Sequence, residues 1–168
     1  ADLSHVWPFK SRLFFIEGGT MSAWYLDVLS VSGAATELPL GSVFLAGGAL
    51  LFGATWSLDS GAGLDDVCLF VTDKGEIAVY EGSDPSDANA WSLVGVYRIG
   101  KPLHKNAWFR AGGDIAVVTD DGVVPVSAAV KTDRAALKGQ AVTYPIEEAW
   151  RQLVARRGAG AIPFSVCL

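Results

Sequence analysis

The sequence predicts a mainly β fold made of repeated antiparallel hairpins in a propeller-like arrangement, with one C-terminal helix. An apolar run closed by Thr-Asp-x-Gly and followed by a second apolar run occurs twice, at residues 67–80 and 114–126. Asp-x-Gly between β-branched runs is typical of a tight hairpin turn. The two glycines, Gly75 and Gly122, lie about 47 residues apart, within the roughly 40–50 residue periods of propeller blades. A β-sandwich is the alternative, because single hairpins need stacked sheets to cover their apolar faces.

The length of the chain predicts that the propeller is incomplete. At about 47 residues per blade, 168 residues hold roughly three and a half blades, whereas closed propellers typically have four to eight. We expect the chain to be one piece of a larger polypeptide or assembly. Propeller-like blades are predicted for residues 1–129. Residues 130–168 are predicted to form a segment that contains a helix and ends in a strand at 162–168.

The composition favours a folded protein with surface buried by partners. Hydrophobic residues make up 51% of the chain and charged residues 18%, with a net charge of −5. This balance argues against disorder and leaves few charges to cover the surface. Basic residues are scattered except for Arg151, Arg156 and Arg157, so no basic stripe predicts sequence-specific nucleic-acid binding.

A long uncharged segment at residues 38–58 needs a separate interpretation. It is long enough to span a bilayer as a helix. However, it contains several glycines, and its apolar triplets at 43–45 and 50–52 flank the pair Gly47-Gly48, as strands flank a turn. We therefore predict strands at 43–45 and 50–56 and no membrane span.

Other elements follow from local patterns. A third hairpin is predicted from strands at 11–16 and 23–26 around Gly18-Gly19, with further strands at 91–99 and 108–109 and a short helix at 128–137. The clearest helix is predicted at 145–157, where Pro145 and two glutamates begin it and arginines end it. An apolar stripe on this helix is predicted to dock on a sheet edge or a partner; it consists of Ile146, Trp150, Leu153 and Val154.

Candidate chemistry is sparse, and the sequence predicts neither an enzyme nor a cofactor. Asp59, Asp65 and Asp66 lie in a glycine-rich loop and are weak candidates for calcium ligands, although a turn rich in Asp and Gly is the favoured interpretation. His5 and His104 lack neighbours at metal-ligand spacing, and Cys68 is expected to be a buried free thiol. The six tryptophans are expected mainly in the core, with a sugar-binding site as the alternative.

Three segments resemble a known family. FKSRLFF at residues 9–15, GEIAVYEGSDP at 75–85 and WSLVGVYRIGKPL at 91–103 resemble the β-propeller-like region of tail proteins of tailed bacteriophages. These are the hub, nozzle or adaptor proteins of short-tailed phages and their prophage relatives. The resemblance extends over residues 7–129.

The resemblance implies a structural component of the virion tail, assembled in the cytoplasm of the host bacterium. Copies would form a ring-shaped homo-oligomer in contact with other tail or portal proteins, and no catalytic residue carries over from the family. A carbohydrate-binding propeller module is the first alternative. A propeller glycosidase is the second, with Asp59 and either Asp65 or Asp66 as the pair of carboxylates that such an enzyme needs.

Overall fold

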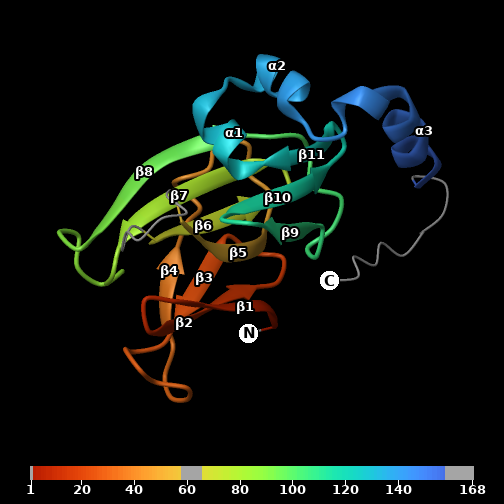
Figure 1. Ribbon diagram of the computed structural model, residues 1–168. Coiled ribbons are helices and arrows are strands. Elements are labelled where there is room, and N and C mark those ends of the chain that lie inside the picture. The colour runs from red at the N-terminus through yellow and green to blue at the C-terminus, as the bar shows by residue number, and fades with distance from the viewer. Residues whose placement is uncertain (1, 58–65, 158–168) are drawn as a thin grey trace.

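A computed structural model describes residues 2–57 and 66–157. The protein is mainly β, with 45% strand and 18% helix, and its strands form three antiparallel sheets (Figure 1). The prediction of a mainly β fold with a C-terminal helix is confirmed. No sheet closes on itself in the described residues, so a propeller is not confirmed.

The first sheet is a meander of four strands near the N-terminus. It contains β1 (Leu3–Phe9), β2 (Arg12–Glu17), β3 (Ser22–Tyr25) and β4 (Thr36–Pro39), in that spatial order. Side chains in β2 alternate between buried and half-buried positions, as expected for a strand that covers a core with one face only. The predicted third hairpin is confirmed as the β2–β3 pair, whereas β1 and β4 were not predicted.

The second sheet forms the centre of the molecule. It contains β5 (Leu50–Ser57), β6 (Asp66–Thr72), β7 (Glu76–Gly82) and β8 (Trp91–Arg98). Strands β6 and β7 are buried along most of their length because both faces of this sheet are covered. Cys68, Phe70 and Ala78 pack toward the first sheet, whereas alternate residues pack into a second cluster shared with the third sheet. The second sheet therefore lies between two apolar clusters, one shared with the first sheet and one with the third.

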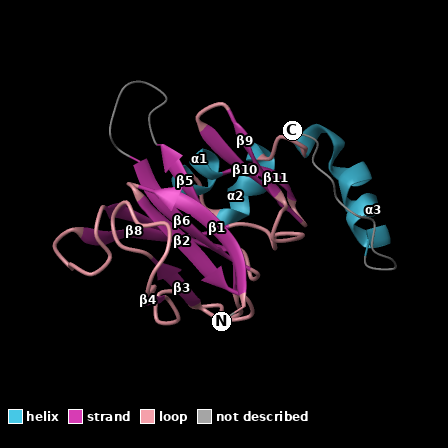
Figure 2. Ribbon diagram, turned by 90° about the horizontal axis from the view of Figure 1, so that it is seen from below, coloured by secondary structure: helices cyan, strands magenta, loops and turns pink. Residues whose placement is uncertain are grey.

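The third sheet and the helices complete the fold (Figures 1 and 2). The sheet contains β9 (Trp108–Ala111), β10 (Asp114–Thr119) and β11 (Gly122–Pro125). It is followed by the helices α1 (Val126–Lys131), α2 (Arg134–Leu137) and α3 (Glu147–Arg157), with the 3-10 turns η1 (Lys138–Gln140) and η2 (Tyr144–Ile146) between α2 and α3. In Figure 1, α3 lies at the upper right, far from the first sheet at the bottom.

Both Thr-Asp-x-Gly phrases form the hairpins that the sequence predicted. The first joins β6 to β7 and the second joins β10 to β11, in two different sheets. Gly75 and Gly122 have φ angles of +78° and +137°, which residues with a side chain rarely adopt. In each turn the threonine hydroxyl accepts backbone N–H bonds, from Glu76 to Thr72 and from Asp121 to Thr119.

Residues 43–45 do not form the predicted strand. The backbone N–H groups of Leu45 and Ala46 donate to the Glu76 carboxylate, and the N–H of Ala49 donates to Asp73. Because these carboxylates take the donors that a neighbouring strand would need, the segment stays a loop against the β6–β7 turn. The glycine pair therefore precedes one strand, β5, rather than separating two.

Two predicted helices have different bounds in the structure. The single helix predicted at 128–137 is two short helices, because Thr132 is extended, with φ −132° and ψ 133°. The helix predicted at 145–157 begins with the turn η2 and becomes α-helical at Glu147. The final strand predicted at 162–168 lies outside the described residues. Across residues 2–57 and 66–157, the structure has no helix with the length and apolar character needed to cross a bilayer.

Candidate functional site

An apolar face covers the outside of the first sheet. Val6, Phe15 and Trp24 lie side by side across β1, β2 and β3, because the register pairs Val6 with Phe15 and Phe15 with Trp24. The neighbouring positions, such as Phe14, point into the core. Val6 is 54% exposed, and Leu3 at the start of β1 is also exposed. We call this surface the outer face; it consists of Leu3, Val6, Phe15, Trp24 and the groove residues named next.

The outer face is hollowed by a groove beside the β3–β4 loop. The groove has a volume of about 380 Å³ and is bounded on one side by the sheet and on the other by the loop. Val31 in this loop is 84% exposed. Large exposed apolar side chains of this kind typically mark interaction surfaces. The groove is lined by Leu3, Phe15, Trp24, Leu26, Val31, Ser32, Gly33 and Ala35.

Acidic side chains border the outer face. The Glu17 carboxylate accepts a hydrogen bond from the Trp24 indole at 3.1 Å, and Glu37 accepts one from the Ser22 hydroxyl at 2.6 Å. Arg12, in contrast, is buried on the inner side of the sheet, where its guanidinium lies 3.0 Å from the Asp84 carboxylate. The border of the outer face therefore carries two carboxylates, those of Glu17 and Glu37.

The four residues of the predicted helix stripe lie in two environments. Trp150 is buried against β10 and donates its indole N–H to the carbonyl of Thr119 at 3.1 Å. Val154 is half-buried in the same cluster. Ile146 and Leu153 are exposed, at 57% and 45%. The chain thus docks one half of the stripe on its own third sheet, and partner binding by the other half stays a prediction.

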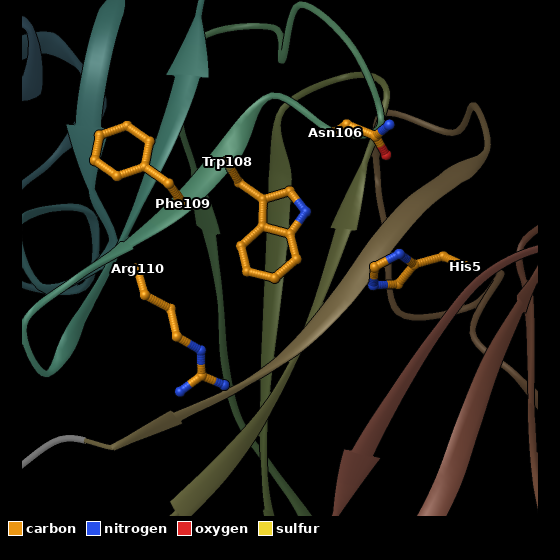
Figure 3. A pocket seen from close by; sticks show the side chains of 5 residues that line it. All are labelled: His5, Asn106, Trp108, Phe109 and Arg110. Carbon is orange, nitrogen blue, oxygen red and sulfur yellow. The ribbon is translucent and has the colours of Figure 1, made fainter. Parts of the chain in front are cut away.

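A second concave region lies between β1 and β9 (Figure 3). This cavity has a volume of about 480 Å³, within the roughly 300–1,000 Å³ of ligand sites. In Figure 3 the side chains of Trp108 and His5 point into the same space, whereas Phe109 points away. Trp108 stacks on Phe52 with ring centroids 5.3 Å apart. The cavity is lined by His5, Asn106, Trp108, Phe109 and Arg110, with no carboxylate among them.

His5 forms one wall of this cavity and is half-buried. Its Nε2 donates to the carbonyl of Gly53 at 2.8 Å, and its ring stacks on Trp7 at 5.6 Å. Burial is the main cause that lowers the pKa of His5, and the nearby Lys105 ammonium lowers it further, against the Gly53 hydrogen bond. The imidazole is therefore neutral in the folded protein at pH 7.

This lowered pKa predicts that the protein loses stability in mild acid. The unfolded chain takes up a proton at His5 near pH 6.5, whereas the folded protein takes it up only at a lower pH. The free energy of unfolding therefore falls as the pH drops below about 6.5, and stops falling once the pH is below the pKa of His5 in the folded protein. In chemical denaturation between pH 7.5 and about 5, His5→Gln should flatten this dependence, since glutamine can still donate to Gly53. His104→Gln is the control for removing an imidazole. An unchanged slope in His5→Gln would contradict the assignment.

The predicted metal candidates do not form a site in the described part of the chain. Asp59 and Asp65 lie outside it. Asp66 is the first residue of β6 and lies opposite Ser57 of β5 in the strand register. Within residues 2–57 and 66–157, no group of three or more His, Cys, Asp or Glu residues is placed to hold a metal ion. Cys68 is buried as predicted, and burial raises the pKa of its thiol, which disfavours the reactive thiolate.

The structure also reveals features that the sequence did not indicate. The groove on the outer face depends on the loop before β4, and the cavity depends on the approach of β9 to β1. Neither could be read from a local pattern.

Comparison with models of protein families, with curated proteins and with solved structures found no match to this chain.

Proposed function

We propose that the protein acts by assembly, through contacts of its outer face with other protein. The observation that carries this proposal is the row of Val6, Phe15 and Trp24, an apolar surface on the outer side of the folded sheet in which Val6 is exposed and Phe15 and Trp24 are half-buried. Burying this surface in an interface would contribute about 25 cal/mol of favourable free energy for each Å² of apolar area removed from water. An interface is the common reason for such a surface in a stably folded protein.

The assembly that we propose is a ring in the tail of a short-tailed bacteriophage or prophage. Its support is the resemblance of residues 9–15, 75–85 and 91–103 to tail proteins, together with the low charge content of the chain. On this proposal the chain is a structural virion component that contacts other tail or portal proteins. It assembles in the cytoplasm of the host bacterium and needs no catalytic residue.

A charge placed on the outer face should prevent assembly. We expect Val6→Glu to reduce the mass measured by light scattering to that of one chain, because burying an unpaired carboxylate in an apolar interface is strongly unfavourable. Val94→Glu is the matched control, since Val94 is also exposed on a strand but lies on β8. Both variants should keep the thermal midpoint of the parent within a few degrees. Assembly by Val6→Glu at the parent's concentration would contradict the proposal.

A carbohydrate-binding module is a second candidate, supported by the cavity between β1 and β9. An indole beside a guanidinium and an amide is a combination that suits a sugar ring carrying a negative group. The donors belong to Arg110 and Asn106, both exposed.

Glycan-array binding tests this second candidate. We expect an acidic glycan to bind, and Trp108→Phe and Arg110→Gln each to weaken binding about tenfold or more, because each removes part of the surface that would hold the sugar. Trp24→Phe is the control, since Trp24 is also half-buried but lies on the outer face. Equal binding by all three variants, or none by the parent, would exclude a sugar site in this cavity.

A further inference from the structure

We propose that helix α3 of one copy lies in the groove on the outer face of the next copy, so that copies join head to tail. This inference rests on the proposed assembly function and names the two surfaces that would meet. It requires an exposed apolar stripe on the helix, a groove that fits it, compatible charges, and a geometry that prevents the contact within one copy.

The exposed side of α3 carries an apolar stripe distinct from the side that docks on β10. Ala149 and Leu153 are four residues apart within α3, which places them on one side of the helix, and Ile146 ends the turn η2 that leads directly into it. All three are exposed, whereas Trp150 and Val154, on the adjoining side of the helix, anchor it to the third sheet. The helix is therefore held in place with this stripe facing outward.

The groove provides a complementary apolar surface. Amphipathic helices bind in apolar grooves through anchors three or four residues apart, which is the spacing of Ala149 and Leu153, with Ile146 adjoining them at the start of the helix. The groove of about 380 Å³ is lined almost entirely by apolar side chains from the sheet and the β3–β4 loop. Val31 stands at the exposed side of the groove, where an incoming helix would cover it.

The charges of the two surfaces are opposite. Arg156 follows Leu153 by three residues and extends the same stripe toward the C-terminal end of α3. The border of the outer face carries Glu17 and Glu37, whose carboxylates accept hydrogen bonds from the neutral donors Trp24 and Ser22. A guanidinium that approaches this border would gain a charge-assisted contact, and the pairing would fix the direction of the helix in the groove.

The positions of the two surfaces favour a contact between copies. In Figure 1, α3 lies at the upper right beside the third sheet, and the first sheet lies at the bottom of the view. A contact between two different surfaces is heterologous. Such contacts produce a ring when the rotation closes and a filament when it does not.

Mixing two defective variants tests the inference. Val31→Glu damages only the groove and Leu153→Glu damages only the helix stripe, at exposed positions that should tolerate the change. Each variant alone should sediment as a monomer, with association weakened at least about tenfold. An equimolar mixture should form a 1:1 heterodimer and nothing larger, because one intact helix and one intact groove remain. Leu93→Glu, which is also 45% exposed but lies on β8, should assemble like the parent.

The outcomes separate this inference from the assembly function itself. If the parent assembles and Leu153→Glu assembles equally well, the helix is not part of the contact, and the inference is wrong while assembly stands. A mixture that contains only monomers also overturns the inference. If the parent stays monomeric at all concentrations, both proposals fail. As a second test, Arg156→Glu should weaken assembly, and Glu37→Arg in the same chain should restore it; no restoration would contradict the proposed direction of the helix.

Discussion

Replacing Phe14 with alanine is expected to lower the free energy of unfolding by about 3–5 kcal/mol. Phe14 is fully buried between the first and second sheets. Its ring lies 5.5 Å from that of Trp7, 5.8 Å from Tyr25 and 6.0 Å from Trp91, measured between centroids. Alanine would leave a cavity among these rings, which are too large and too constrained to close it. Urea denaturation followed by tryptophan fluorescence measures the loss.

The neighbouring Phe15 provides a matched control for Phe14. It has the same side chain and lies in the same strand, but it points to the outer face and is half-buried. Phe15→Ala should cost about 1 kcal/mol, because the alanine is solvated and no closed cavity forms. A similar loss for the two variants would contradict the assignment of the inner and outer faces. Phe14→Leu, with a smaller expected loss, covers the case in which Phe14→Ala does not fold.

Replacing Glu76 with alanine is expected to cost about 2–4 kcal/mol. The Glu76 carboxylate is buried and accepts hydrogen bonds from the backbone N–H groups of Leu45 and Ala46, at 3.3 and 2.9 Å. It also lies 3.3 Å from the guanidinium of Arg98. Arg98 is half-exposed and can return to water, so most of the expected loss comes from the two backbone hydrogen bonds to the buried carboxylate.

Glu81 is the control for Glu76 on the same strand. Its exposed carboxylate accepts one hydrogen bond, from the hydroxyl of Ser92 at 3.0 Å, and Glu81→Ala should change stability by less than about 0.5 kcal/mol. Glu76→Gln keeps one acceptor oxygen and should give an intermediate loss. Hydrogen exchange at Leu45 and Ala46 should accelerate in Glu76→Ala. Stability in Glu76→Ala equal to that in Glu81→Ala would contradict the role of Glu76 in holding the loop.

The hairpins could be predicted from sequence because their determinants are local. A threonine, an aspartate and a glycine with positive φ lie within four residues of one another, and both phrases fold as expected. The loop at 43–48 could not be predicted, because its backbone donors are bonded to Glu76, about 30 residues away in sequence. The arrangement of hairpins into three open sheets also depends on packing between distant strands, which the period of 47 residues does not encode.

The interaction surface could be predicted only in part. Consecutive apolar residues such as Phe14 and Phe15 fit either face of a strand, so the sequence does not show which of them points to the outer face. The apolar residues of α3 were recognisable from their spacing. However, the split between the docked Trp150 and the exposed Leu153 depends on the position of Thr119 in a neighbouring sheet.

Sedimentation velocity of the unmodified chain over a range of concentrations tests the central claim most directly. The claim is that the outer face of the first sheet is an assembly surface. We expect a discrete species of several copies that dissociates on dilution and is lost in Val6→Glu. A single monomeric species for the unmodified chain at every concentration, identical to that of Val6→Glu, would contradict the claim.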